Sequence, residues 1–160
     1  MKTKLFAYAL LLLTVVIGVG ACNKNETTTS SGTVSFTATL KGAVETPPNT
    51  STATGMANFT FNKTTKILSG TVTFSGITTT AAHIHKGAVG VPGGVIFPLG
   101  TAPFTSPINF TSAALDSTQE ADLMAEMYYV NVHSTQFPDG EIRGQLMKKT
   151  TSTTTGGGGY

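Results

Sequence analysis

The stretch VSFTATL, Val34 to Leu40, alternates apolar and polar side chains and decides the fold class. Every second residue is apolar and the residues between are serine or threonine, which is typical of a strand with one face in a core. The same period returns in MANFTFN (56–62) and ILSGTVTFSGI (67–77), separated by the short polar turn NKTTK. We therefore predict a β-hairpin from these two segments.

Further strand candidates follow, each short and bounded by Gly, Pro or Asp. Short strands at regular spacing with much Thr and Val predict an all-β fold, a Greek-key or immunoglobulin-like β-sandwich, over residues 33–149. The additional candidates are AAHIH (81–85), GVIFPL (94–99), PINFT (107–111), YYVNVHS (128–134) and EIRGQLMK (141–148).

One segment, DSTQEADLMAEM, departs from the strand period and predicts a short helix near residues 117–127. Ser117 and Glu120 fit a capping box, while Leu123, Met124 and Met127 form a helical stripe. We expect the helix to pack across an open end or edge of the sandwich. The methionines are interpreted as core contacts, because methionine commonly fills gaps.

The N-terminus has the pattern of an export signal, in which Lys2 and Lys4 precede the apolar run LFAYALLLLTVVIGVG. The run ends in VGAC, at the chain's single cysteine, Cys22, which resembles a bacterial lipobox. That resemblance implies a signal peptide over 1–21, lipidation of Cys22 and a lipid-anchored protein of the bacterial cell envelope. Asn23 stands where some bacteria have an aspartate for inner-membrane retention, so we expect the outer membrane. The alternative is an ordinary signal peptide followed by a free cysteine.

The two flanks of the folded region are polar and simple in composition. Residues 22–32 predict a flexible tether, and the Thr- and Gly-rich residues 150–160 predict a disordered tail. Removing Lys2 and Lys4 from ten basic residues leaves eight, which match the eight acidic ones. This balance excludes the basic surface that nucleic-acid binding needs. A single cysteine also excludes an intrachain disulfide.

Four segments together carry a family resemblance. They are FTATLKGAVETPP, ATGMANFTF, AAHIHKGAVGVPGGV and YYVNVHSTQFPDGEIRGQL. In this order they resemble the CHRD domain, the chordin-type domain also common in bacterial envelope proteins. The resemblance implies an extracellular β-rich module with a loosely defined role, and so favours a non-enzymatic binding or structural function with an unidentified envelope or extracellular macromolecule as partner.

The three histidines suggest a second function. His83 and His85 lie two residues apart, so on a strand they project from one face with backbones about 6.6 Å apart. His133 lies in YYVNVHS and supplies a third nitrogen if that strand is a neighbour. Three imidazoles with an open fourth position suit copper or zinc. The His-x-His pair before a Gly-rich loop, with a later strand histidine, is also similar to the copper ligands of Cu,Zn superoxide dismutases, which are Greek-key sandwiches.

Three residues are candidates to support these ligands from behind, namely Asn131, Glu141 and Arg143, with Glu141 accepting an imidazole N–H. A structural account competes with the metal site. In it the histidines are hydrogen-bonding plugs beneath the Gly87–Gly94 loop, and Glu141 pairs with Arg143. The chain lacks a complete catalytic set, because Glu45 and Asp139 are interpreted as a loop carboxylate and a turn residue. We therefore do not predict an enzyme.

Overall fold

The alternation that begins at Val34 builds the first three strands. The structure, a computed structural model, describes residues 32–149. Its strands β1 (Thr33–Lys41), β2 (Thr54–Asn62) and β3 (Ile67–Ser75) pair antiparallel in sequence order. Their register places Phe36 opposite Phe59, and both are buried. The antiparallel pairing of β2 with β3 confirms the predicted hairpin.

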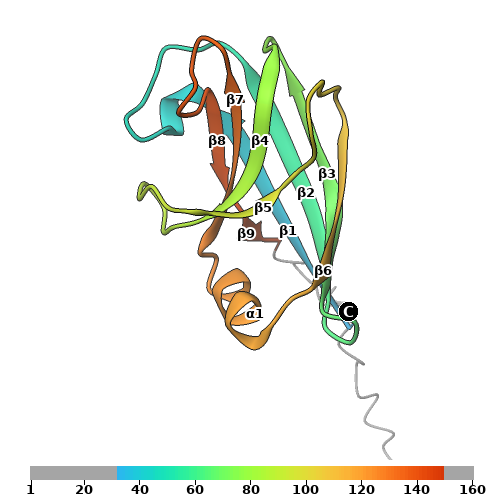
Figure 1. Ribbon diagram of the computed structural model, residues 1–160. Coiled ribbons are helices and arrows are strands. Elements are labelled where there is room, and N and C mark those ends of the chain that lie inside the picture. Colours follow the sequence, from blue (N-terminus) through green and yellow to red (C-terminus); the bar gives the residue numbers. More distant parts are fainter. Residues whose placement is uncertain (1–31, 150–160) are drawn as a thin grey trace, which may run out of the picture.

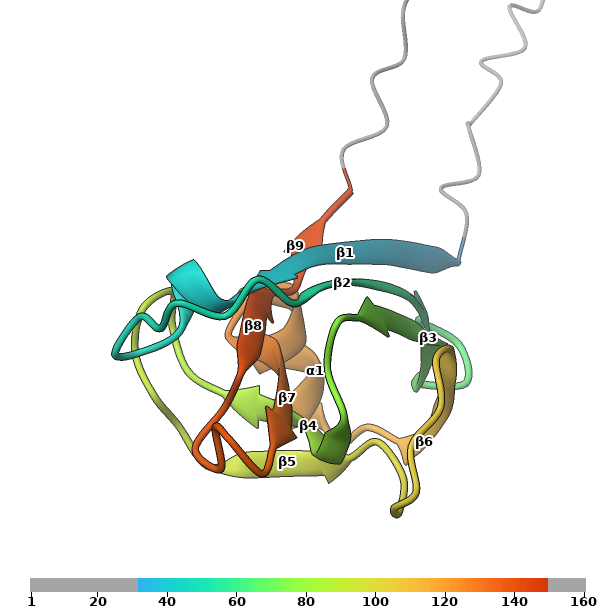
Figure 2. The ribbon, with the colours of Figure 1, turned by 90° about the horizontal axis from the view of Figure 1, so that it is seen from above.

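The remaining strands extend this sheet until it curls into a nearly closed barrel, as Figures 1 and 2 show. The order of strands is β5-β4-β7-β8-β1-β2-β3-β6, with β9 paired to β1 outside this path. The edge strands β5 and β6 approach each other through Phe97 and Phe110, whose ring centroids are 5.8 Å apart. The all-β prediction is confirmed. These strands are β4 (Thr79–Lys86), β5 (Val95–Pro98), β6 (Ile108–Ala114), β7 (Tyr128–Ser134), β8 (Ile142–Gln145) and β9 (Met147–Lys148).

The last predicted strand, EIRGQLMK, is two strands in the structure. β8 pairs with β7 and reaches β1 at Lys41, whereas β9 pairs with Phe36 and Thr37 farther along β1. Leu146 lies between them and is 0% exposed, so the break accompanies insertion of this side chain into the core. The alternation of apolar and polar residues along a segment does not by itself show where such a break falls.

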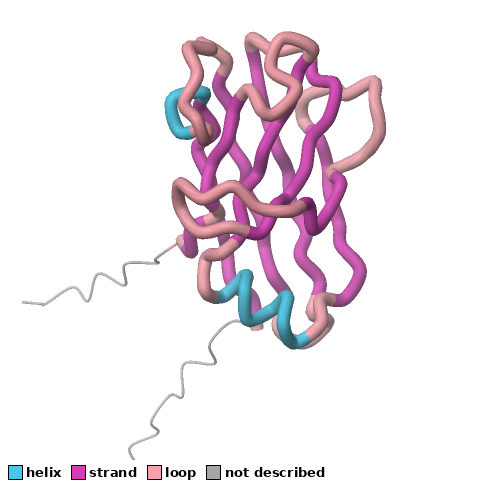
Figure 3. Tube along the Cα trace, turned by 60° about the vertical axis from the view of Figure 1, so that its left-hand side comes forward, coloured by secondary structure: helices cyan, strands magenta, loops and turns pink. Residues whose placement is uncertain are grey.

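The short helix α1 (Ser117–Met124) lies at one end of the barrel, as Figures 1 and 3 show. Its capping box is one residue earlier than we predicted: Asp116 caps the backbone N–H of Gln119, and the Gln119 side chain accepts from the Asp116 N–H. The offset arises because aspartate and glutamine make the same reciprocal contacts as serine and glutamate. Leu123 enters the core as expected.

Two connections at the opposite end complete the barrel. The first, from β1 to β2, includes the 3-10 helix η1 (Gly42–Val44), and the second joins β7 to β8.

No helix among residues 32–149 is long and apolar enough to cross a bilayer. The signal peptide, Cys22, the tether up to residue 31 and the tail at 150–160 fall outside the described residues, so these predictions remain open.

Candidate metal centre

The outer face of β4, β7 and β8 is covered by loops, and this cover creates a polar interior site. All seven residues of β7 are buried, although only Tyr128, Val130 and Val132 belong to the core cluster. The alternate residues Tyr129, Asn131 and His133 face outward from the barrel and are at most 8% exposed. A polar strand face that is removed from water needs internal partners.

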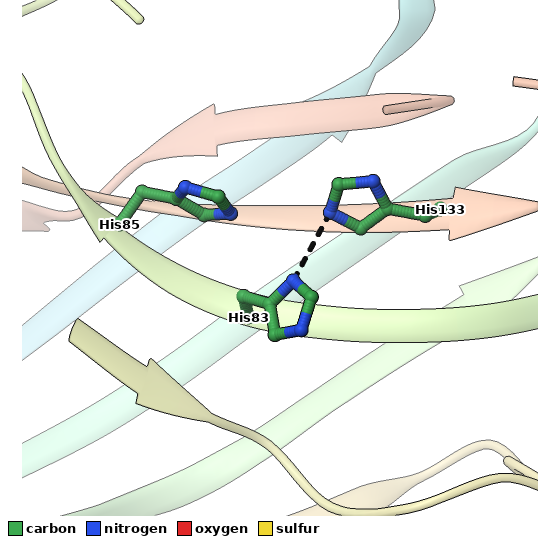
Figure 4. A group of neighbouring side chains, drawn as sticks. All are labelled: His83, His85 and His133. Carbon is green, nitrogen blue, oxygen red and sulfur yellow. Dashed lines mark hydrogen bonds between the residues drawn. The ribbon is translucent and has the colours of Figure 1, made fainter. Parts of the chain in front are cut away.

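The three histidines meet on this covered face. β4 and β7 are direct neighbours, with His83 opposite Asn131 and Ala81 opposite His133. The structure therefore has the strand neighbours that the three-histidine arrangement requires. Figure 4 shows the three rings gathered over the two strands, with His83 and His133 joined by the dashed line. The ring centroids are 5.5 Å apart for His83–His85, 5.0 Å for His83–His133 and 6.0 Å for His85–His133.

One nitrogen from each ring lies close to a nitrogen of the other two. The three donor atoms lie within 4.8 Å of one another. Three such points fit inside a circle of radius about 2.8 Å (4.8/√3), which exceeds the usual metal–nitrogen distance of about 2.0–2.1 Å by less than 1 Å. Side-chain rotations that move each nitrogen by less than 1 Å would bring all three to metal-binding distance of one ion.

Backbone carbonyls set the tautomers of two rings. His85 Nδ1 donates to the Gly93 carbonyl at 2.9 Å, and His133 Nδ1 donates to the Pro138 carbonyl at 2.9 Å. In a neutral imidazole the other nitrogen then carries a lone pair. His85 Nε2 is buried without a partner among the described residues. His133 Nε2 lies 3.2 Å from His83 Nδ1, the contact drawn in Figure 4.

These contacts bear on both accounts of the histidines. The structural account predicts bonds to the Gly87–Gly94 loop, and His85 makes one. Such bonds occupy Nδ1, however, and so orient the Nε2 lone pairs of His85 and His133 inward. A metal-ligating histidine characteristically donates its other N–H to a carbonyl or carboxylate. The carbonyl contacts are therefore compatible with a metal site.

The electrostatics keep two of the rings neutral. Burial lowers the pKa of His83, and the neighbouring His133 and His85 lower it further. Burial also lowers the pKa of His85, against the opposing effect of the Gly93 hydrogen bond and with smaller contributions from His133 and Arg143. Neutral imidazole is the form that binds metals, so these two rings are already in that form at neutral pH.

Tyr129 and Arg143 hold His85 from behind. The Tyr129 ring stacks on His85 with centroids 4.9 Å apart and planes 9° apart, and the Arg143 guanidinium lies 3.5 Å from the Tyr129 centroid. Arg143 also donates to the carbonyls of Ala88 and Val91 in the Gly87–Gly94 loop, at 3.3 and 2.8 Å. Arg143 thus supports the site through a stacked ring and a loop, and has no hydrogen bond to an imidazole.

Glu141 does not have the supporting role that we predicted. Its Oε1 accepts from Ser51 Oγ at 2.6 Å, and no ion pair with Arg143 forms within residues 32–149. The reason is the β1–β2 connection, which packs against the start of β8 and brings the serine hydroxyl to the carboxylate. The carbonyls of Gly93 and Pro138 take the imidazole N–H groups instead. Main-chain carbonyls have no signature in a sequence, so these two partners could not be foreseen.

Asn131 and Glu45 form a second buried polar group beside the histidines. Both side chains approach Gly140, where a Cβ would lie 2.5 Å from Asn131 Nδ2 and 2.7 Å from Glu45 Oε1. Asn131 Oδ1 and Glu45 Oε1 are buried without partners among the described residues. Burial raises the pKa of Glu45 to about 7, despite the opposing effects of Arg143 and a backbone hydrogen bond. Glu45 is a loop carboxylate, as the sequence predicts, but it is only 7% exposed and its pKa is raised, which the sequence does not predict.

Comparisons with known proteins identify a family for most of the folded region. The family model described as CHRD domain matches residues 36–146. No curated protein and no solved structure matches the chain. The matched range includes the three histidines and their carbonyl partners.

Proposed function

The chain belongs to the CHRD domain family, and from this premise we propose that it is a lipid-anchored envelope module that binds one copper or zinc ion. His83, His85 and His133 are the ligands in this proposal. The observation that carries it is the convergence of three imidazole nitrogens, two of which have their lone pairs directed inward by backbone carbonyls. Without a metal, His85 Nε2 would remain a buried nitrogen with no partner among the described residues.

The donor set favours copper and zinc among common metals. Neutral imidazoles suit both ions, whereas calcium and magnesium prefer oxygen ligands. Three protein ligands leave one position for water or a small ligand, the arrangement of an open site rather than a closed structural one. Copper in this position would allow one-electron exchange, and zinc would not. The residues do not form a catalytic set, so the proposal is metal binding without an assigned reaction.

Metal titration of the purified full-length chain in detergent tests the site. We expect one equivalent of Cu²⁺ or Zn²⁺ to bind, and His133→Ala to weaken binding by about 100-fold or more, beyond the 10–100-fold typical of a lost supporting contact. His83→Ala is the variant most favourable for folding, because His83 is the least buried of the three and has no backbone partner within residues 32–149. Glu120→Gln, in a surface ion pair with Lys66, is the matched control. Equal metal uptake by wild type and both histidine variants would refute the proposal.

Membrane attachment through Cys22 is the second part of the proposal. Its support is the lipobox-like VGAC after an apolar run, followed by a polar segment long enough to separate the domain from a bilayer. Each buried methylene of an acyl chain contributes about 0.8 kcal/mol to membrane binding, so several chains give lasting attachment. The expected location is the outer membrane of a bacterial envelope, with an envelope or extracellular macromolecule as partner.

The anchor has its own test, independent of metal. Cys22→Ser should move the protein from the membrane to the soluble fraction of expressing bacteria and abolish incorporation of labelled palmitate. Ser31→Cys with Cys22→Ser is the control, because it restores a thiol outside the lipobox. Continued membrane partition of Cys22→Ser would show that the apolar run is retained as a membrane segment instead.

A further inference from the structure

A second polar site lies at the end of the barrel opposite α1, around Glu141. Three connections meet there: residues 50–53 before β2, residues 76–78 between β3 and β4, and residues 135–137 after β7 (Figure 1). They surround a groove with two lobes of about 290 and 230 Å³. Gly76, Gln136 and Glu141 line both lobes, so the lobes adjoin along these three residues.

Glu141 is the chemical centre of this groove. The residue is only 6% exposed, and one oxygen accepts from Ser51 Oγ at 2.6 Å. Its Oε2 has no hydrogen-bond partner among residues 32–149, and the two ion pairs found there involve other carboxylates. A nearly buried carboxylate without a counter-charge is costly unless donors reach it. The free oxygen therefore marks a position where a ligand can donate.

The remainder of the lining is neutral and rich in hydroxyl groups. Gln136 adds an amide that both donates and accepts, while Ile77 and Phe137 add apolar surface. A bound divalent cation would need about six to eight oxygen ligands, usually with several carboxylates, and this groove has one. The lining hydroxyls belong to Thr50, Ser51, Thr52, Thr78, Ser134 and Thr135.

We propose that this groove binds a neutral saccharide, with Glu141 Oε2 accepting from sugar hydroxyls. A sugar supplies several O–H donors to a carboxylate, which makes the charge-assisted hydrogen bonds that the site lacks. Its ring hydroxyls also match the donor and acceptor pattern of threonine and glutamine. Phe137 is half-buried in the lobe that Glu141 also lines, and gives the apolar face of a sugar ring a surface to contact. The larger lobe is at the lower end of the volumes typical of ligand pockets, about 300 Å³.

Co-sedimentation with insoluble polysaccharides tests this site. The full-length chain, in a detergent without a sugar head group, is mixed with cellulose, with chitin and with chitosan, which is cationic. We expect retention on cellulose or chitin, and a loss of at least tenfold in apparent affinity for Glu141→Gln, which keeps the acceptor for Ser51 but removes the charge. Gln136→Ala should also weaken binding. Its side chain is exposed and makes no hydrogen bond within the described residues, so this variant should fold normally.

The controls separate this site from the metal centre. Thr60→Ala, an exposed threonine on the outer face of β2, and His83→Ala should both bind as the wild type does. Absence of binding to both neutral polysaccharides would overturn the proposal, as would undiminished binding by Glu141→Gln. Retention on chitosan alone would also overturn it, because that result would indicate an ammonium ligand.

Discussion

Tyr128 and Tyr129 are adjacent residues whose hydroxyl groups have opposite environments. The Tyr128 ring points into the barrel, where its hydroxyl is buried without a partner among the described residues. Burial, with smaller contributions from Asp122 and Asp116, raises the pKa of this phenol to about 12. The Tyr129 hydroxyl lies on the other face and accepts from the Gly93 N–H at 3.0 Å. The Tyr128 hydroxyl is therefore a buried polar group without a hydrogen bond among the described residues, whereas the Tyr129 hydroxyl holds the loop that contains Gly93.

This difference predicts opposite effects for the same substitution. Tyr128→Phe should stabilise the fold by about 1 kcal/mol, because it removes a desolvated hydroxyl that gains no hydrogen bond. Tyr129→Phe should destabilise it by about 1 kcal/mol, because the Gly93 N–H loses its acceptor. Urea unfolding of both variants beside the wild type measures the two changes. Destabilisation by Tyr128→Phe would mean that the hydroxyl has a partner.

Glu45 makes stability depend on pH. Because its pKa is about 7 in the fold and 4.5 ordinarily, the folded state binds more protons than the unfolded state between these values. Stability should therefore fall as pH rises from about 4.5 to 7, by on the order of 3 kcal/mol at about 1.36 kcal/mol per pKa unit. The difference in unfolding free energy between wild type and Glu45→Gln isolates this contribution. A difference that stays constant across this pH range would exclude it.

At the scale of elements, the Gly87–Gly94 loop lies against the outer face of the sheet and contacts His85 there. Gly93 contributes the carbonyl that binds His85, and a Cβ at this position would collide with the Lys86 carbonyl. A Cβ on Gly94 would meet no atom within 4 Å. Of these two adjacent glycines, Gly93 thus has no room for a side chain and Gly94 has.

We expect Gly93→Ala to shift the loop and weaken metal binding at least tenfold, the lower range for a lost supporting contact. Gly94→Ala should leave metal affinity within about twofold, since this position has open space. Metal titration of the two variants, with circular dichroism to confirm folding, provides the comparison. An equal loss of metal affinity in both variants would mean that the effect comes from a general change in loop flexibility.

The helix α1 offers a second matched pair. Asp116→Ala should destabilise the protein by about 1 kcal/mol, because this side chain caps the Gln119 N–H. Ser117→Ala should change stability by less than about 0.5 kcal/mol, since Ser117 is exposed and is not the cap. Thermal unfolding distinguishes the two. A larger loss of stability for Ser117→Ala than for Asp116→Ala would instead support the capping box of Ser117 and Glu120 that the sequence predicts.

Periodicity predicted the elements well because strand alternation is a property of each segment alone. VSFTATL and YYVNVHS required no knowledge of distant residues to be identified as strands. The roles of Glu141 and Glu45 were missed because they depend on the β1–β2 connection, which places Ser51 against one carboxylate and buries the other. Loop packing of this kind depends on contacts about 90 residues apart along the chain, such as Ser51 with Glu141, and leaves no local pattern.

For the whole molecule, the candidate centre joins the two strands β4 and β7, which are separated along the chain by β5, β6 and α1. An ion that binds only the folded state stabilises it by about 2.7 kcal/mol at one hundred times its dissociation constant. Metal addition should therefore raise the unfolding temperature of the wild type, and EDTA should reverse the rise. His133→Ala should show no shift. An equal shift in this variant would place the ion elsewhere.

The pairing of the first strand with the last ones has a consequence for biosynthesis. β1 is bordered by β2 on one side and by β8 and β9 on the other. A nascent chain can form the β1–β2–β3 meander early, but the second edge of β1 stays unpaired until residues 142–148 emerge. Closure must then follow synthesis of nearly the entire domain, because its pairings span the full sequence and are slow to form. For the export proposed above, the chain would thus remain open, and able to thread, for most of its synthesis.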